Sequence, residues 1–209
     1  EENIMPLGAN KAAIMGVAGT AAAGDVVLLS TTTIGSDSDT VTISANITST
    51  YGEYIFGFYR ITCDTGDNVM HFQVNGAGES GFNEVMTTTH FRAQHSEADD
   101  YVTLGYPTAA DQAQGTGYQT IFAGLNGDGT AADECANGVL HLFNPSSTTY
   151  VKHFYSRFID VNAGNSNEPG AWDGFTAGYI NTTTAIDEIS FKMLSGQLEG
   201  GVIKLWGVK

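Results

Sequence analysis

Basic residues are scarce in this chain, which has 8 lysines and arginines against 23 aspartates and glutamates and a formal net charge of -15. Proteins that bind nucleic acid through its phosphates need a clustered basic surface, and anionic membranes attract the same kind of charge. We therefore expect no nucleic-acid partner and no membrane partner. The acids are scattered, which indicates a self-repelling surface, with adaptation to salty water or docking on a basic partner as alternatives.

Cysteine is also rare, with only Cys63 and Cys135 present. Two cysteines allow one disulfide, but the sequence alone cannot bring them within bonding distance. The chain has no CxxC motif and no Cys/His cluster, so we expect no zinc site. No apolar run approaches the roughly 20 residues of a membrane-spanning helix. The chain begins at Glu1 without a recognisable signal peptide, which leaves open whether the amino terminus is processed.

Catalytic patterns are missing as well. No serine lies in a GxSxG nucleophile elbow, and no pair of carboxylates is singled out for glycoside hydrolysis. His90 and His95 lie near acidic residues, but without a nucleophile motif beside them. Residues 127–134 are only faintly similar to a calcium loop, because their spacing does not match an EF-hand. We therefore expect no enzyme activity, no catalytic residues, no cofactor and no metal.

The chain is instead rich in Thr, Ser, Asn and Gly, arranged in short runs separated by turn residues, while charged residues make up only 15%. Runs of this kind predict strands with uncharged polar outer faces. We expect strands at residues 26–33, 39–47, 51–62, 69–74, 84–93, 101–106, 118–125, 138–143, 150–161, 175–181, 186–193 and 201–207, and one helical turn at 111–114. The pattern predicts an all-β fold, a β-sandwich or jelly roll of roughly 8–12 antiparallel strands.

Residues 1–24 differ from the rest, because they are small, rich in Gly and Ala, and contain few apolar anchors. We expect an extended N-terminal arm that becomes ordered when another subunit covers it. A floppy terminus and an isolated helix at 12–18 are the alternatives. Residues 25–209 then form one β-sandwich domain, a common length for an all-β unit.

The end of the chain carries the clearest strand signal. Residues 186–193 and 201–207 alternate apolar and polar side chains on either side of Ser195 and Gly196. This pattern predicts a β-hairpin, with Trp206 buried in the seam that closes the sandwich. A chain that ends in such a strand needs a sheet that is closed or covered there.

Two connections differ in what they predict. Residues 144–147, Asn-Pro-Ser-Ser, predict a tight turn, because proline is preset for its second position. Residues 162–173 exceed the ordinary connection length and predict an exposed loop that carries Trp172. Such loops often make recognition contacts, and their rings can stack on sugars. Trp172 and Tyr179 are therefore our candidate ligand or partner contacts, with core or edge packing as the alternative.

Several segments together resemble one group of proteins. They are residues 51–54 (YGEY), Asn83-Glu84 before a Thr-rich strand, residues 140–154 (LHLFNPSSTTYVKHF), residues 178–183 (GYINTT), residues 186–193 (IDEISFKM) and residues 203–207 (IKLWG). In these segments the chain is similar to virion structural proteins of tailed bacteriophages, especially marine ones. The resemblance covers most of the chain beyond residue 25 and rests on strand and turn residues.

This resemblance implies a jelly-roll sandwich on the virion surface, without enzyme activity and without site residues that carry over. One compact domain with a short arm favours a capsid decoration or cement protein. A tail or head fibre receptor-binding protein and a secreted carbohydrate-binding module are the alternatives. The expected partners are other virion proteins (the major capsid protein or tail proteins) and further copies of the chain, with a trimer expected first. A surface glycan is the partner in the alternatives.

Overall fold

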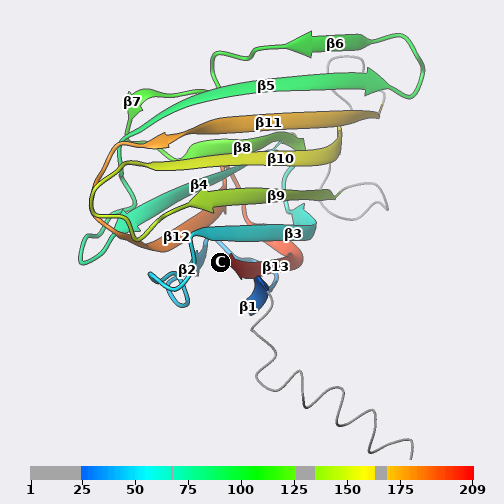
Figure 1. The fold of residues 1–209 in the computed structure, drawn as a ribbon. Coiled ribbons are helices and arrows are strands. Elements are labelled where there is room, and N and C mark those ends of the chain that lie inside the picture. Colours follow the sequence, from blue (N-terminus) through cyan, green and yellow to red (C-terminus); the bar gives the residue numbers. More distant parts are fainter. Residues whose placement is uncertain (1–24, 67, 126–134, 163–168) are drawn as a thin grey trace, which may run out of the picture.

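The computed structural model describes residues 25–66, 68–125, 135–162 and 169–209, which form thirteen strands and no helix. All the strand pairs are antiparallel, and the strands make two sheets that pack as a sandwich (Figure 1). The predicted all-β sandwich is therefore confirmed, and its architecture is consistent with a jelly roll. The strand count lies just above the expected range. The predicted arm, residues 1–24, lies outside the described residues.

The two sheets differ in size. Across the larger sheet the order is β1 (Val26–Ile34), β13 (Leu198–Val208), β3 (Glu53–Cys63), β9 (Ala136–Phe143), β10 (Lys152–Asn162), β11 (Gly170–Ile180), β5 (Met86–Ser96) and β6 (Val102–Gly105), and the short β7 (Ala113–Gly115) also pairs with β5. Across the smaller sheet the order is β2 (Val41–Ile43), β12 (Ile186–Met193), β4 (Asn68–Gly76) and β8 (Gln119–Leu125). The larger sheet therefore extends beyond the smaller one and has a broad outer face.

Phenylalanine rings from both sheets meet in the core. Phe191 of β12 lies 5.7 Å and 5.0 Å, between ring centroids, from Phe56 and Phe58 of β3. Phe72 of β4 lies 4.8 Å from Phe154 of β10. All five side chains are almost completely buried, and each contributes about 1.5–3 kcal/mol of transfer free energy. The inner faces are thus held together mainly by apolar burial.

A bulge in β3 explains an irregular pattern in the sequence. Phe56 and Phe58 point into the core, but the next buried residues, Ile61 and Cys63, have the opposite parity. The register with β9 shifts between Phe58 and Ile61, and Arg60 between them has a φ of 49°. An extra residue in one strand changes which parity of the following residues faces inward. Ile61 and Cys63 therefore face the core although their parity differs from that of Phe56 and Phe58.

The predicted terminal hairpin is wrong. β12 pairs with β2 and β4 in the smaller sheet, whereas β13 pairs with β1 and β3 in the larger sheet. The connection at Gly196 therefore crosses from one sheet to the other. Alternation correctly predicts that each of these strands buries one face, as Phe191 and Leu205 do, but it does not identify the neighbouring strand. Trp206 lies half-buried on the outer face of the larger sheet, over Gly57, and not in the core.

Three local predictions have different outcomes. The turn at 144–147 is confirmed, since the amide of Ser147 donates to the carbonyl of Asn144 at 3.0 Å. The helical turn at 111–114 is wrong, because this segment enters β7. The loop predicted at 162–173 is wrong from Gly170 onwards, where β11 begins. A Cβ on Gly170 would lie 2.6 Å from the carbonyl oxygen of His95, so this glycine allows close strand approach and does not mark a loop.

Candidate binding groove on the outer face of the larger sheet

Aromatic rings cross the outer face of the larger sheet. Odd-numbered side chains of β9, β10, β11 and β5 share this face, because side chains alternate along a strand. The rings of His141 and Phe143 lie 4.4 Å and 5.8 Å from Tyr155, between ring centroids. Phe175 lies 5.9 Å from Tyr155, and Phe91 lies 5.1 Å from Phe175. These five stacked or tilted rings form what we call the aromatic ladder.

A shallow hollow of about 600 Å³ lies beside the aromatic ladder. Its lining includes the small residues Ala177 and Gly178 of β11 and the rings of Tyr155 and Tyr179. The hydroxyl of Tyr179 accepts a hydrogen bond of 3.3 Å from the side-chain amide of Gln114. Tyr179, one of the two predicted contact residues, therefore belongs to this hollow.

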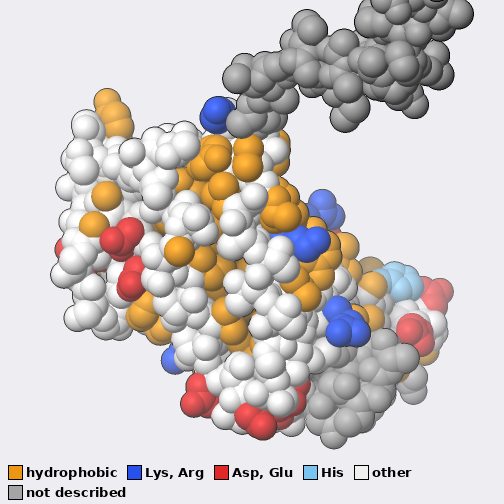
Figure 2. All heavy atoms as spheres, turned by 90° about the horizontal axis from the view of Figure 1, so that it is seen from below, with side chains coloured by type: hydrophobic (Ala, Val, Ile, Leu, Met, Phe, Trp, Pro, Cys, Tyr) orange, Lys and Arg blue, Asp and Glu red, His pale blue; other side chains and the backbone are white. Residues whose placement is uncertain are grey.

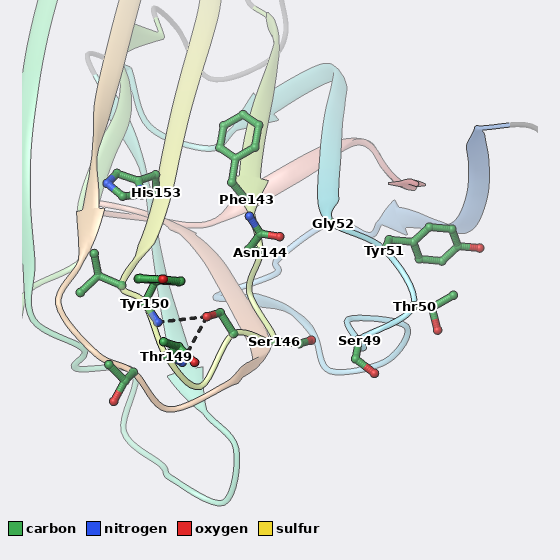
Figure 3. Close-up of a pocket in the computed structure, with 13 residues that line it drawn as sticks. Ser49, Thr50, Tyr51, Gly52, Phe143, Asn144, Ser146, Thr149, Tyr150 and His153 are labelled. Carbon is green, nitrogen blue, oxygen red and sulfur yellow. Dashed lines mark hydrogen bonds between the residues drawn. The ribbon is translucent and has the colours of Figure 1, made fainter.

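A larger cavity of about 940 Å³ lies where loops meet at one end of the sheet. Figure 3 shows Ser49, Thr50 and Tyr51 on one side of it, and Asn144 and Tyr150 on the other. Seven of the thirteen lining residues are Ser, Thr or Asn, and four of the other six carry rings. The cavity thus combines hydroxyl and amide groups with aromatic faces.

The cavity and the hollow are neighbouring parts of one depression, because Phe143 and His153 line both. We call the combined feature the outer groove. It runs from the loops at the end of the sandwich onto the strands of the larger sheet. Each part lies within the size range typical of small-molecule sites, roughly 300–1,000 Å³.

Buried Tyr54 holds one wall of the outer groove. Its hydroxyl donates to the carbonyl of Thr48 and accepts from the amide of Thr48, both at 2.7 Å. This fixes the segment that leads to Tyr51. The ring of Tyr51 lies so close to Gly207 that a Cβ there would come within 2.5 Å of it. The Gly of the terminal LWG sequence therefore makes room for a ring of the groove.

The β9–β10 turn forms the opposite wall. The hydroxyl of Ser147 accepts from the amides of Thr149 and Tyr150, at 3.3 Å and 3.0 Å (Figure 3). The amide of Asn144 donates to the carbonyl of Gly52 at 2.7 Å, which ties the two walls together. The backbone that presents Tyr150 is thus fixed, while the Tyr150 side chain itself is 74% exposed.

A buried lysine supports the third loop. The ammonium of Lys152 donates to the carbonyls of Thr182 and Thr184, on either side of the groove residue Thr183. Burial lowers the pKa of Lys152, and the negative charge of Glu84 acts in the opposite direction. The lysine thus fixes the backbone between β11 and β12 by capping two carbonyls that strand pairing leaves unused.

The outer groove carries no formal charge apart from what His153 contributes, since no Asp, Glu, Lys or Arg lines either part. Charged groups near the ladder are paired instead. Arg157 donates to both carboxylate oxygens of Asp173, at 2.9 Å and 2.6 Å, and this contact raises the pKa of the arginine. His141 is hydrogen-bonded to Glu53. In a chain of net charge -15, this is an unusually neutral region.

Trp172, the other predicted contact residue, is not part of the groove. Seven positions separate it from Tyr179, so the two side chains lie on opposite faces of β11. Its ring lies 4.4 Å from the guanidinium of Arg92, and it stands beside Asp160 of β10. Asp160 is only 4% exposed, and burial raises its pKa to about 8, with Arg92 opposing the shift. The structure therefore separates the two predicted residues.

Two further histidines are held neutral outside the groove. Burial lowers the pKa of His71 and of His90 to about 4, and the positive charges of Lys192 and Arg92 add to the respective shifts. His90 is also hydrogen-bonded through Nδ1 to the hydroxyl of Thr176 at 2.8 Å. Both histidines are anchored by their neighbours, which fits a structural role.

Within the described segments, no group of three or more His, Cys, Asp or Glu side chains is placed to hold a metal ion. The segment similar to a calcium loop, 127–134, lies outside them. Cys63 and Cys135 are not joined by a disulfide, and the thiol of Cys63 donates to the carbonyl of Thr65 at 3.0 Å. The same segments include no helix with the length and apolar character of a membrane span.

Most of the groove residues were not predicted from the sequence, although one pattern in the sequence indicates an aromatic outer face. In β9 and β10 the rings of His141, Phe143 and Tyr155 alternate with the buried side chains Leu142 and Phe154. Strands with apolar residues on one face and aromatic rings on the other indicate two functional faces. The pairing that brings these strands together could not be read from the chain.

The chain matches no model of a known protein family, and no curated protein matches it either. Its function therefore has to be argued from its surfaces. The outer groove offers stacked rings, uncharged hydrogen-bonding groups and loops fixed in advance. Such a lining holds a ligand by stacking and hydrogen bonding and not by charge.

Proposed function

We propose that this protein is a non-enzymatic structural protein of a tailed-bacteriophage virion, displayed on the particle surface, with capsid decoration as its first assignment. Three features support the proposal: the segments that resemble phage virion proteins, the sandwich fold, and a broad apolar outer face. The broad apolar outer face carries most weight, because exposed apolar surface gathered on one face indicates contact with another protein.

Exposed hydrophobic side chains gather on the outer face of the larger sheet. Seven of the ten large ones in the described chain lie there: Val26, Leu28, Tyr59, Phe91, Val102, Leu104 and Ile159. Single exposed hydrophobic residues are ordinary, but their concentration on one face marks an interaction surface. Figure 2 views the molecule from the side of β1 and β13, and shows hydrophobic side chains in the middle of the surface with acids towards its margins.

The neighbours that fit this face are other virion proteins, including further copies of this chain. The exposed residues extend from β1 at one edge of the larger sheet to β6 at the other, which suits a broad protein contact. A stable interface of standard size buries about 800 Å² on each partner. The edge strands also present unpaired backbone groups that a neighbouring chain can cover.

The mass of the protein in solution tests this use of the outer face. At about 100 μM we expect an oligomer, a trimer first, and we expect Leu104→Glu combined with Ile159→Glu to give a monomer. Leu194→Glu is the matched control, because Leu194 is exposed in the connection between β12 and β13 and is not one of the seven residues of this face. Light scattering after size-exclusion chromatography measures the masses. A monomeric wild-type protein would contradict self-association through this face.

Immunogold labelling tests the assignment to a virion. Antibodies against the chain should label intact phage particles that encode it, and label on the head favours decoration. Label on the tail alone would instead favour a receptor-binding protein of the tail. Particles that carry no label, with the protein found only outside them, would refute the virion assignment.

A further inference from the structure

We propose that the outer groove binds a neutral oligosaccharide, with the ring of Tyr150 as the main stacking surface. None of the seven exposed hydrophobic residues named above lines this groove, although they share the outer face of the larger sheet with it. The proposal depends on the groove lining alone and does not require the proposed structural role.

The chemistry of the lining is that of a sugar. A pyranose ring has apolar C–H faces and a rim of hydroxyl groups that both donate and accept hydrogen bonds. Aromatic rings such as Tyr150 and Tyr51 cover an apolar face, and the hydroxyls of Ser49, Thr50 and Thr183 match the rim. Hydroxyls are suitable partners because each one donates and accepts, so a lining of Ser and Thr adapts to either role.

Charge selects a neutral ligand over its competitors. Nucleic acids and acidic glycans would need Lys or Arg in the groove, and basic peptides would need Asp or Glu; none of these residues lines it. The surrounding chain, with its net charge of -15, repels anionic ligands from a distance. An uncharged sugar avoids both problems.

The shape of the groove favours several sugar units over one. The larger cavity, of about 940 Å³, adjoins the hollow of about 600 Å³ at Phe143 and His153, which line both. Within the hollow, the rings of Tyr155, Phe175 and Tyr179 offer further stacking surfaces on the strands. The two parts together suit an oligosaccharide that starts at the loops and extends over the sheet.

The walls are also fixed before any ligand arrives. The Tyr54 hydroxyl, the Asn144–Gly52 backbone hydrogen bond and the Lys152 ammonium each hold one of the three loops. Binding to a preformed site does not have to order its loops, and this raises affinity without new contacts. Tyr150 is largely exposed, so its ring is free to meet a ligand.

Isothermal titration calorimetry with defined oligosaccharides tests the proposal. The probes are the neutral hexasaccharides of β-1,3-glucose, α-1,4-glucose and β-1,4-mannose, with oligogalacturonate as the anionic comparison. We expect saturable binding of at least one neutral probe, with a Kd on the order of 100 μM, and no binding of oligogalacturonate. We expect Tyr150→Ala to weaken that binding by about tenfold or more, and Tyr150→Phe to retain it within about threefold, because the ring provides the stacking.

Tyr106→Ala is the matched control, since Tyr106 is also exposed but lies outside the groove. It should leave binding unchanged, and melting curves should show that all three variants are folded. The proposal is overturned if no neutral probe binds at about 10 mM, if only the anionic probe binds, or if Tyr150→Ala binds as well as the wild type. None of these results affects the mass or labelling experiments on the outer face.

Discussion

Asp160 is an acidic side chain in a buried position that does not fully satisfy it. It is almost completely buried on the inner side of β10, and within the described chain its Oδ1 has no hydrogen-bond partner. The positive charge that opposes this burial is that of Arg92, whose guanidinium lies over the ring of Trp172. Burying a carboxylate without full pairing is costly, so the pKa of Asp160 rises to about 8. The folded protein therefore holds this side chain protonated at neutral pH.

Replacing Asp160 should stabilise the protein in a pH-dependent way. The pKa of Asp160 is raised on folding, so the unfolded chain binds fewer protons between about pH 4 and pH 8 and stability falls as pH rises through that range. Asparagine does not ionise, so Asp160→Asn removes this loss of stability at high pH. We expect the free energy of unfolding of the variant to exceed that of the wild type by about 2–5 kcal/mol near pH 8, and by almost nothing near pH 4.

Urea denaturation across this pH range measures the difference. Asp173→Asn is the control, because the Asp173 side chain is 36% exposed and paired with Arg157 near the surface, and such pairs contribute little to stability. A gain for Asp160→Asn that is equally large at both ends of the range would show that the charge of Asp160 is not its cause.

At the scale of elements, β13 determines how the sandwich is built. It lies between β1 and β3 in the larger sheet and buries Ile203 and Leu205 completely against the core. Its other face carries Trp206, which packs over Gly57 and near Tyr59. One strand therefore joins the core to the outer surface, and its two faces should respond differently to mutation.

Leu205→Ala should destabilise the protein more than Trp206→Ala, although tryptophan is the larger side chain. The first substitution leaves a cavity in the core and should cost about 3 kcal/mol, whereas the second removes a half-buried ring from the surface and should cost about 1 kcal/mol. Thermal unfolding of the two variants decides the order. The reverse order would mean that Trp206 belongs to the core seam after all.

The same strand shows what could be predicted from sequence. Period-2 alternation predicted every strand of the described chain except β7, although with different bounds for most of them, because the residues of a strand themselves show which of its faces is covered. It could not show that β12 and β13 belong to different sheets, since pairing is a relation between distant segments. Strand β11 was partly missed because glycines such as Gly170 looked like loop residues, whereas they allow close strand contact.

The outer groove was even less predictable. Its loops come from three separate parts of the chain, and their closeness depends on contacts such as the Asn144–Gly52 hydrogen bond and the Lys152 cap. The length of residues 162–173 predicted an exposed loop with Trp172 as a contact residue. The β10–β11–β5 pairing instead places Trp172 on the inner face of the larger sheet. Tyr150, in contrast, follows the turn at 144–147, for which the sequence predicts no ligand contact.

At the scale of the whole molecule, charge and apolar surface are segregated. The chain carries a net charge of -15, and exposed acids such as Asp37, Asp64 and Asp99 lie in the loops between strands. The outer face of the larger sheet holds most of the exposed hydrophobic side chains. We therefore expect copies of the chain to repel each other at long range, and we expect the proposed contact between their outer faces to depend on apolar groups.

This segregation predicts that salt strengthens self-association. Raising NaCl from about 20 mM to about 500 mM shortens the Debye length from roughly 20 Å to about 4 Å, which screens repulsion between acidic copies and leaves apolar contacts intact. We expect the association constant from sedimentation velocity to rise by about tenfold or more. The Leu104→Glu, Ile159→Glu variant should stay monomeric throughout. An association that weakens with salt would instead show that ion pairs hold the copies together.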